Sequence, residues 1–326
     1  MEIYVMNRTD LKKQKKRKFR WFRFILFLMV FILIAGTAYW IVQYNSGKSA
    51  ASEDAPKKED YQFDGSIPNN GEMNVLLLGS DSRGEELART DTIMIAHYSD
   101  KQKQPKLISI MRDSYVSIPG YGNNKINAAF AFGGPDLLRK TIEENFGIDI
   151  NYYAIVDFEG FEKVADIVAP NGIKVNVPHK MSEGIGMTLQ PGEQTLKGKQ
   201  LLGYVRYRKD TQSDFGRVAR QQEVLSKMKE EATDIESITQ LPKILGTIEP
   251  YVTTNVPSTA FLGLGRDIVL GDTKEVDTLR IPVDGSYTDQ SYSNIGSVLD
   301  LDIEENSQAI KDFLAGKASQ ESDSSS

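Results

Sequence analysis

Short apolar runs alternate along this chain with segments whose apolar residues recur at helical spacing. Residues 73–80 and 91–98 are near-continuous apolar runs of strand length, typical of strands buried on both faces of a sheet. Further strands are predicted at 106–111, 152–157, 173–177 and 276–282. Helices are predicted at 134–147 (with Gly147 as C-cap), 158–168, 196–207, 216–233, 237–248 and 257–264. This alternation predicts an α/β sandwich with a mixed central sheet.

The first apolar segment is long enough to cross a membrane. Residues 24–42 carry no charge over nineteen positions, which as a helix would span about 28 Å, close to the thickness of a bilayer's hydrocarbon core. Trp21 and Trp40, the only tryptophans, stand at its two ends, as interfacial anchors do. The segment therefore predicts one N-terminal transmembrane helix.

The flanks of this segment predict its orientation. Residues 1–23 hold nine Lys/Arg against Glu2 and Asp10, so the positive-inside rule places them in the cytoplasm. A cleaved signal peptide ending at the small residues 49–52 is the alternative, but the apolar run exceeds a typical signal h-region. We therefore expect a single-pass type II protein of the cell membrane. Its expected parts are a cytoplasmic segment (1–23), a signal-anchor (24–42), a flexible tether (43–60), an extracytoplasmic catalytic domain (61–315) and a disordered tail (316–326).

Composition narrows the possible chemistry. The chain has no cysteine, which excludes disulfides, thiol catalysis and iron–sulfur clusters, and its two histidines, His97 and His179, do not suggest a histidine metal site. Oxygen-ligated cations such as Mg²⁺ remain possible. The net charge is −6 although the first 23 residues are strongly basic, so the rest of the chain is strongly acidic. An acidic body argues against nucleic-acid binding.

Charged residues stand directly beside the first two predicted strands. The stretch LLLGSDSRGEELARTDTIMI (76–95) holds Asp81, Arg83, Arg89 and Asp91. Buried charges are costly unless they are paired or bind a ligand. Surface salt bridges at strand ends are one interpretation, and a site for a metal ion and a polyanion is the other.

Two further segments add cations and carboxylates. Residues 109–127 contribute Arg112, Asp113 and Lys125. Residues 204–222 contribute Arg206, Arg208, Asp214, Arg217 and Gln221. The planar guanidinium binds phosphate oxygens in pairs and stays charged when desolvated, so several arginines with a divalent cation suit a pyrophosphate. No Walker A loop, G-x-S-x-G elbow or H-E-x-x-H pattern is present.

From about residue 73 to 233 the sequence resembles the LytR-CpsA-Psr family, enzymes that attach teichoic acids and capsular glycans to peptidoglycan. The resemblance rests on LLLGSDSR, RTDTIMI, SIMRDSYVSIPGYG, KINAAFAFGGP, YYAIVDFEGFEKVAD and YVRYRKD…SDFGRVARQQ. Met111 and Ser114 depart from the family's common proline and threonine, which leaves the rigidity of that loop open. The short architecture, without an extra domain, is similar to that of the regulatory members of the family.

The resemblance implies an α-β-α sandwich with an apolar pocket for a polyprenyl chain and a pyrophosphate site at its mouth. Sequence alone does not separate apolar residues of the core from those that would line this pocket. Asp81 and Asp91 match the family's Mg²⁺ (or Mn²⁺) ligands. The expected pyrophosphate-binding residues are Arg83, Arg89, Arg112, Lys125, Arg206, Arg208, Arg217 and Gln221. Arg112, Asp113 and Asp214 are the expected catalytic residues, and the general base is left open among Asp91, Asp113 and Asp214.

The expected function is therefore glycopolymer transfer from a polyprenyl-pyrophosphate carrier to peptidoglycan at the membrane, with no nucleic-acid partner. Two alternatives stay open: a membrane-bound regulatory protein that acts indirectly on gene expression, and a protein that binds or hydrolyses the lipid carrier. The sequence does not identify which polymer is transferred.

Overall fold

The structure is a computed structural model, and it describes residues 18–52, 59–69, 71–80, 90–210, 213–231, 237–258, 260 and 275–317. A six-stranded sheet, ordered β10-β3-β2-β1-β6-β9, lies at its centre. The strands are β1 (Glu72–Ser80), β2 (Thr90–Ser99), β3 (Lys106–Ile110), β6 (Tyr152–Asp157), β9 (Thr253–Thr254) and β10 (Asp277–Ile281). Because β1 pairs antiparallel with β2 and parallel with β6, the sheet is mixed. The expected α/β fold with a mixed central sheet is confirmed.

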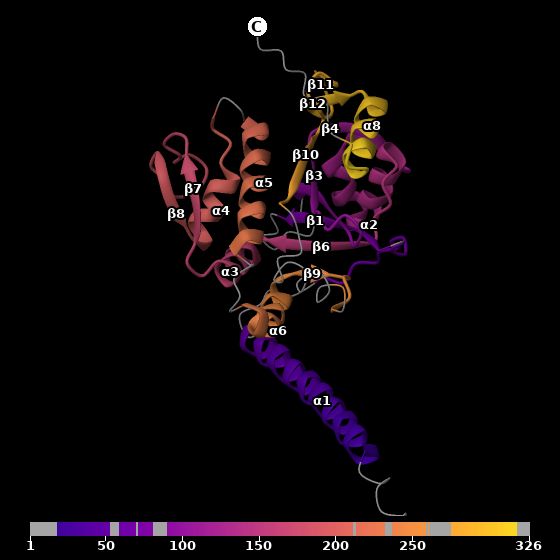
Figure 1. The fold of residues 1–326 in the computed structure, drawn as a ribbon. Coiled ribbons are helices and arrows are strands. Elements are labelled where there is room, and N and C mark those ends of the chain that lie inside the picture. Colours follow the sequence, from indigo (N-terminus) through magenta and orange to yellow (C-terminus); the bar gives the residue numbers. More distant parts are fainter. Residues whose placement is uncertain are drawn as a thin grey trace, which may run out of the picture.

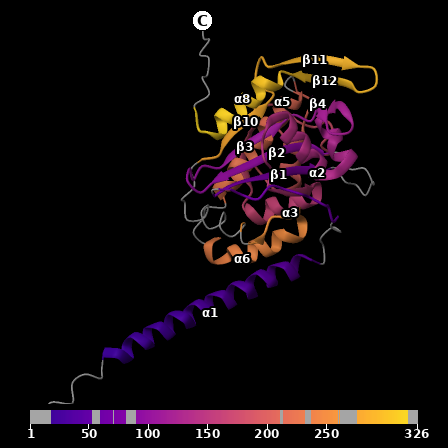
Figure 2. The same cartoon turned by 90° about the vertical axis from the view of Figure 1, so that its right-hand side faces the viewer.

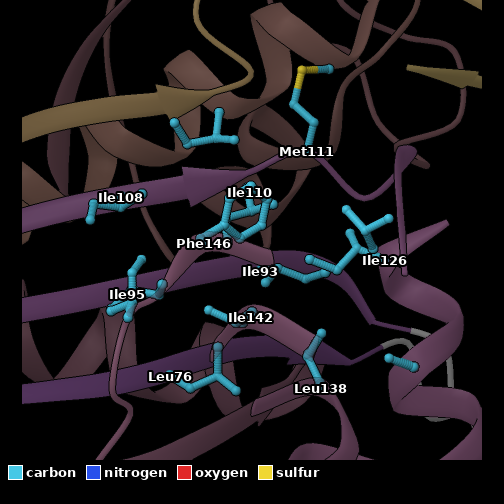
Figure 3. Packing of buried hydrophobic residues seen from close by; sticks show 14 of the residues in the cluster. Leu76, Ile93, Ile95, Ile108, Ile110, Met111, Ile126, Leu138, Ile142 and Phe146 are labelled. Carbon is cyan, nitrogen blue, oxygen red and sulfur yellow. The ribbon is translucent and has the colours of Figure 1, made fainter. Parts of the chain in front are cut away.

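Helices cover both faces of this sheet (Figure 1). One face packs on α2 (Ile126–Phe146) and α8 (Ile303–Leu314), and its side chains, such as Leu76, Ile95 and Ile108, are fully buried (Figure 3). The other face lies opposite α3 (Phe158–Val168), α4 (Gly198–Arg206) and α5 (Ser213–Glu231). Since side chains alternate along a strand, neighbouring residues of β1, β2 and β6 face these two different surroundings.

Helix α2 begins earlier than its pattern predicts. The expected start at residue 134 coincides with a kink, where Gly133 and Gly134 leave helical geometry just before Pro135. An additional helical segment, from Ile126, precedes the kink. The C-terminal end agrees with the prediction, because Gly147 adopts the left-handed conformation (φ 68°) and donates its N–H to Glu143 O.

The structure adds strands that the sequence pattern did not predict. β11 (Tyr287–Tyr292), β12 (Gly296–Leu301), β4 (Ser114–Ile118) and β5 (Gly122–Lys125) form a second sheet, and the unpredicted β8 (Gly192–Leu196) pairs with the predicted strand β7 (Ile173–Val177). Several of these strands are short and exposed, so an apolar pattern is weak in them. The helix predicted at 196–207 begins only at Gly198, because Leu196 belongs to β8. Most of the helix predicted at 257–264 lies outside the described residues.

The N-terminal helix α1 (Lys18–Ala51) projects from the body beside α6 (Ser237–Ile248) and the short 3₁₀ helix η1 (Glu249–Tyr251) (Figures 1 and 2). Residues 43–51, expected to belong to a flexible tether, instead continue this helix and pack on α6. Residues 1–17, 53–58 and 318–326 lie outside the described residues.

In the part of the chain that the structure describes, no helix is both long and apolar enough to cross a membrane. Many side chains of the expected span, residues 24–42, lie outside that description. The membrane anchor stays a prediction.

Candidate active site

Three carboxylates and one arginine meet where β2 begins, β3 ends and α5 begins. Asp91 is the second residue of β2, Arg112 and Asp113 follow β3, and Asp214 lies in the first turn of α5. Arg112 Nη1 donates to Asp91 Oδ1, while Arg112 Nη2 lies 3.4 Å from Asp214 Oδ2. Arg112 Nε lies 3.3 Å from Asp113 Oδ2. A single guanidinium therefore joins carboxylates from three separate segments.

Arg208 and Arg217 reach the same carboxylates. Arg208 Nη2 donates to Asp91 Oδ2 at 2.8 Å, and its Nε lies 3.4 Å from Asp214 Oδ1. Arg217 Nη1 lies 3.0 Å from that same Asp214 oxygen. Burial acts to raise the pKa of Asp91, but Arg112, Arg208 and Arg217 outweigh it, so the pKa lies below its usual value. Asp91 is therefore an anion that holds one arginine on each oxygen.

Lys125, at the end of β5, completes the cluster from the second sheet. Its Nζ donates to Asp113 Oδ1 at 2.7 Å. Burial acts to raise the pKa of Asp113, but the hydrogen bond from Lys125 and the charge of Arg112 lower it overall. Among the described residues, the site cluster thus holds four cations (Arg112, Lys125, Arg208 and Arg217) against three carboxylates (Asp91, Asp113 and Asp214).

Arg217 is the most deeply buried cation of the site cluster, with a side chain only 3% exposed. Burial lowers its pKa to about 10, so it still carries its charge at neutral pH. Within the described residues, Arg217 Nε and Nη1 and Asp214 Oδ1 are buried without a hydrogen-bond partner, because the Arg217–Asp214 ion pair lacks hydrogen-bond geometry. Buried donors of this kind are costly unless a ligand accepts from them.

The backbone that carries Arg112 is a tight turn. Met111 N donates to Ile281 O at 2.8 Å, and Ser114 N donates to Met111 O at 3.0 Å. The Met111 and Ser114 side chains therefore stand in a turn held by backbone hydrogen bonds, and Met111 is itself buried.

The loop that carries Arg208 has a support that the sequence analysis missed. Arg220 on α5 forms a buried ion pair with Asp210 at 2.7 Å and donates to the carbonyl oxygen of Tyr207. Tyr207 Oη donates to Lys209 O at 3.0 Å. The sequence offered one signal that Arg220 lies near the site, because it follows Arg217 by three residues on the same predicted helix. Arg220 positions the loop, whereas Arg217 faces the site cluster.

An elongated apolar cavity of about 400 Å³ begins beside the site cluster. Its walls come from one face of β1, β2 and β6 and from α3, α4 and α5, with α1, α6 and residues 252–258 adding further parts. Gln221, Val224 and Met228 line it on successive turns of α5, so it runs at least about 10 Å along that helix. Leu77, Met94, Val156, Phe161 and Leu202 are typical of the lining.

Gln221 and Arg206 are polar residues of the cavity wall, and Gln221 lies next to the site cluster. Gln221 Nε2 donates to Thr92 Oγ1 at 3.0 Å, and Thr92 directly follows Asp91. Arg206 lines the cavity with its guanidinium carbon 3.8 Å from the centroid of the Phe158 ring. Thr92 and Phe158 are site neighbours that the sequence analysis did not single out, since neither is charged.

Three expected site residues, Asp81, Arg83 and Arg89, lie outside the described residues. Within the described part of the chain, no group of three or more His, Asp or Glu side chains is arranged to hold a metal ion. Both oxygens of Asp91 contact arginines. The roles predicted for the individual site residues therefore stay predictions.

The fold and the site define a mixed α/β protein with an arginine-rich cluster of charged side chains beside an apolar cavity. The family model described as "LytR_cpsA_psr family" matches residues 37–311. The chain belongs to the LytR-CpsA-Psr family, as its sequence motifs predicted.

Named relatives fall into two groups. Regulatory protein MsrR of Staphylococcus aureus (strain COL) is 44% identical over 276 residues, covering 85% of this chain and 84% of MsrR. The polyisoprenyl-teichoic acid–peptidoglycan teichoic acid transferase TagU of Oceanobacillus iheyensis is 34% identical over 265 residues, covering 77% of this chain and 82% of TagU. The similarity to MsrR agrees with the expected resemblance to the regulatory members of the family.

A solved structure adds a bound ligand to the comparison. It is that of the LytR-CPS2A-psr family protein YwtF (TagT) with bound octaprenyl pyrophosphate lipid. It is 27% identical, has a TM-score of 0.58 and covers 80% of this chain and 96% of that chain. YwtF is a Bacillus subtilis protein.

Proposed function

We propose that this chain is a phosphotransferase that moves an anionic glycopolymer, teichoic acid or a capsular-type glycan, from a polyprenyl-pyrophosphate carrier to peptidoglycan. The observation that carries the proposal is the position of Arg217. This buried arginine has unsatisfied N–H groups and lies in a cationic cluster next to an apolar cavity. A ligand with a diphosphate head and an apolar tail would bind the cationic cluster with its head and fill the apolar cavity with its tail. The lipid bound to TagT and the activity named for TagU support this choice.

The arginines and Lys125 act on the diphosphate. Arg112 and Arg208 would exchange contacts with Asp91 for phosphate oxygens, and Arg217 would donate its unsatisfied N–H groups. Arg206 and Gln221, at the junction with the cavity, would hold the phosphate that bears the lipid. Preorganised cations of this kind stabilise the charge that develops on transferring phosphoryl oxygens.

The transfer itself exchanges one phosphorus–oxygen bond for another. A hydroxyl oxygen of a peptidoglycan sugar attacks the phosphorus nearer the glycan, and the bond to the bridging oxygen breaks. Polyprenyl phosphate leaves, and the proton of the hydroxyl passes to a carboxylate. Asp91, Asp113 and Asp214 are the candidate bases, because these are the carboxylates of the described site cluster. The donor's own phosphoanhydride supplies the energy.

A divalent cation, Mg²⁺ or Mn²⁺, fits the donor chemistry of this site. Mg²⁺ is commonly held by one or two carboxylates together with substrate phosphates, so a cluster of three protein ligands is not required. Asp91, and Asp81 in the neighbouring undescribed segment, are the proposed ligands. The ion would neutralise charge on the diphosphate when bound. Asp91 would first have to release an arginine, which the diphosphate oxygens make possible.

The location that we propose follows from the N-terminal sequence. Residues 24–42 would anchor the chain in the cell membrane as a single-pass type II protein, with the catalytic domain outside the cytoplasm. There the lipid-linked donor and the peptidoglycan acceptor are both within reach. The acidic body supports the absence of a nucleic-acid partner.

A regulatory role is the second candidate, and the name of MsrR favours it. A third possibility is a protein that binds or hydrolyses the lipid carrier. The test is to supply the full-length protein with a lipid-pyrophosphate-linked glycan, with and without peptidoglycan oligomers. Polymer linked to peptidoglycan supports the transferase, free glycan phosphate indicates a hydrolase, and unchanged donor indicates a binder or regulator. Activity that survives a chelator would exclude the proposed cation.

Variants of Arg208 test the diphosphate clamp directly. Octaprenyl pyrophosphate should raise the melting temperature of the wild type, because a ligand that binds only the folded state stabilises it. Arg208→Lys should show a smaller rise although it keeps the charge, because lysine cannot bind two oxygens in a fixed fork. Arg208→Ala should show the smallest rise.

The matched control is Arg280→Lys, at an arginine that contacts Asp284 and the Phe215 ring rather than the site cluster. It should retain the full ligand-induced rise. An equal rise in all four proteins would refute the clamp.

A further inference from the structure

The C-terminal part of α1 is in direct backbone contact with α6. A Cβ atom added to Gly47 would lie 2.3 Å from Lys243 O, and one added to Gly246 would lie 2.1 Å from Tyr44 O. Such distances leave no room for any side chain at either position. The two helices therefore cross through facing glycines, a contact that fixes how close α1 lies to α6. Figure 2 shows α1 running alongside α6.

Side chains on either side of this crossing fix the rotation of α1. Tyr44 Oη donates to Glu249 Oε2 at 2.7 Å, and Lys48 Nζ lies 2.9 Å from Glu249 Oε1. Tyr44 and Lys48 are one turn apart on α1, so a single carboxylate on η1 holds one face of the helix toward α6.

The same rotation directs two aromatic side chains of α1 to the apolar cavity. Trp40 and Tyr44 both line it, and their rings stack with centroids 5.2 Å apart. Neighbouring apolar residues on α1 behave differently, because Tyr39, Ile41 and Val42 are 52%, 48% and 66% exposed. The aromatic pair therefore belongs to the wall of the cavity, whereas the rest of this part of α1 faces away from it.

Trp40 and Tyr44 belong to α1, which packs on α6, whereas the site cluster lies at the start of α5. Asp214 is in the cluster and Met228 lines the cavity, and these residues are separated by about 21 Å along α5. Helix α6 and η1, which hold α1, contribute Leu245, Ile248 and Glu249 to the same lining. If its diphosphate is bound at the site cluster, a prenyl chain must extend along this cavity to contact α1.

We infer that Trp40 and Tyr44 of α1 are specificity-determining residues, which contact the distal part of a polyprenyl chain and make the site select long chains over short ones. The inference rests on the proposed function, since it takes the cavity as the lipid site. It gives the N-terminal helix a part in ligand recognition as well as in anchoring. The glycine crossing and Glu249 position the two aromatic residues.

The test measures affinity for two ligands with the same head and different tails, farnesyl pyrophosphate and octaprenyl pyrophosphate. The full-length chain is held in lipid nanodiscs, and binding of each ligand is titrated. Trp40→Ala should weaken binding of octaprenyl pyrophosphate by about tenfold, because it removes a large apolar surface of the cavity wall. It should leave farnesyl pyrophosphate within about twofold, since that tail ends before α1. Tyr39→Ala, the adjacent exposed aromatic, is the matched control and should change neither affinity.

A second pair of variants tests the helix crossing. Gly246→Val should reproduce the length-selective loss, because its side chain forces α1 away from α6. Gly36→Val is its control, since a Cβ at Gly36 meets no atom within 4 Å.

Unchanged affinities in Trp40→Ala, or equal weakening of both ligands, would overturn the inference. A wild type that binds both tails equally would overturn it while leaving the proposed function intact, and a wild type that binds neither would refute the proposed function itself.

Discussion

The two faces of the central sheet are made from the same strands, but one face is close-packed and the other lines a cavity. On the face toward α2, Leu76, Ile95 and Ile108 are each 0% exposed and pack against Leu138 and other buried side chains (Figure 3). The opposite face lines the cavity. Its residues there include Leu77, Met94 and Ala154, which are neighbours across β1, β2 and β6.

Both faces therefore require apolar residues, and the apolar sequence alone does not determine which face is filled and which lines a cavity. A filled face gains dispersion contacts from close packing, whereas the lining of a cavity gives up part of these contacts. One face is filled, and under the proposed function the cavity on the other face receives the apolar tail of the ligand. Substitutions on the two faces should therefore separate stability from binding.

The largest effect is expected on the filled face. Ile95→Ala should lower the free energy of unfolding by about 2–5 kcal/mol, because it leaves a cavity in a close-packed cluster. Denaturant titration measures the loss. Binding of octaprenyl pyrophosphate to the remaining folded protein should stay near the wild-type affinity. A loss of stability below about 1 kcal/mol would mean that this face is not the main core.

A smaller effect is expected when neighbouring residues of β6 are enlarged. Ile155 belongs to the filled cluster, whereas Val156 lines the cavity. Ile155→Phe should destabilise the protein by about 1–3 kcal/mol through overpacking. Val156→Phe should cost little stability but weaken the binding of octaprenyl pyrophosphate, because the added ring occupies the space that the proposed ligand needs. Similar stability losses in both variants would contradict the division of the faces.

The smallest effect concerns His97, a buried titratable side chain of β2. His97 is 5% exposed, and its Nδ1 lies 2.8 Å from Asn74 Oδ1. Burial lowers the pKa of His97 below its usual value, and Lys106 adds to the shift while Glu72 opposes it. The unfolded chain therefore binds the proton first, so stability is present above about pH 6.5 and falls as pH drops toward the folded pKa.

The contribution of His97 to this fall is at most about 1.4 kcal/mol per pH unit, the limit for one proton. His97→Gln should flatten the stability profile below about pH 6.5, as measured by denaturant titration at each pH. An unchanged slope would show that other groups cause the acid sensitivity.

Regular elements with strong periodicity were predictable from sequence. Residues 152–157, 158–168, 173–177 and 237–248 have the predicted type and bounds. The second sheet was not predictable, because β5 and β11 are short, largely polar strands whose pairing depends on distant partners. Helix α8 was missed as well, although Asp302 caps it by accepting from Glu305 N at 2.9 Å.

The site shows the same division between local and non-local signals. Asp91 and Arg112 were identifiable because a charge beside an apolar run is locally unusual, and the structure brings them into contact. Trp40 was interpreted only as an interfacial residue, because its place in the cavity wall depends on a helix about two hundred positions later. Arg220 went unassigned because its partner, Asp210, precedes the helix that carries Arg220 and no periodicity links the two.

The order of strands in the central sheet has a consequence for synthesis of the chain. The edge strands β10 and β9 pair with β3 and β6, so both edges are made from residues after 250. Until that part of the chain has been made, β3 and β6 would present bare hydrogen-bonding edges, which favour association between chains. Pairing across such long separations is also slow. A nascent chain would therefore benefit from protection until nearly all of it has emerged.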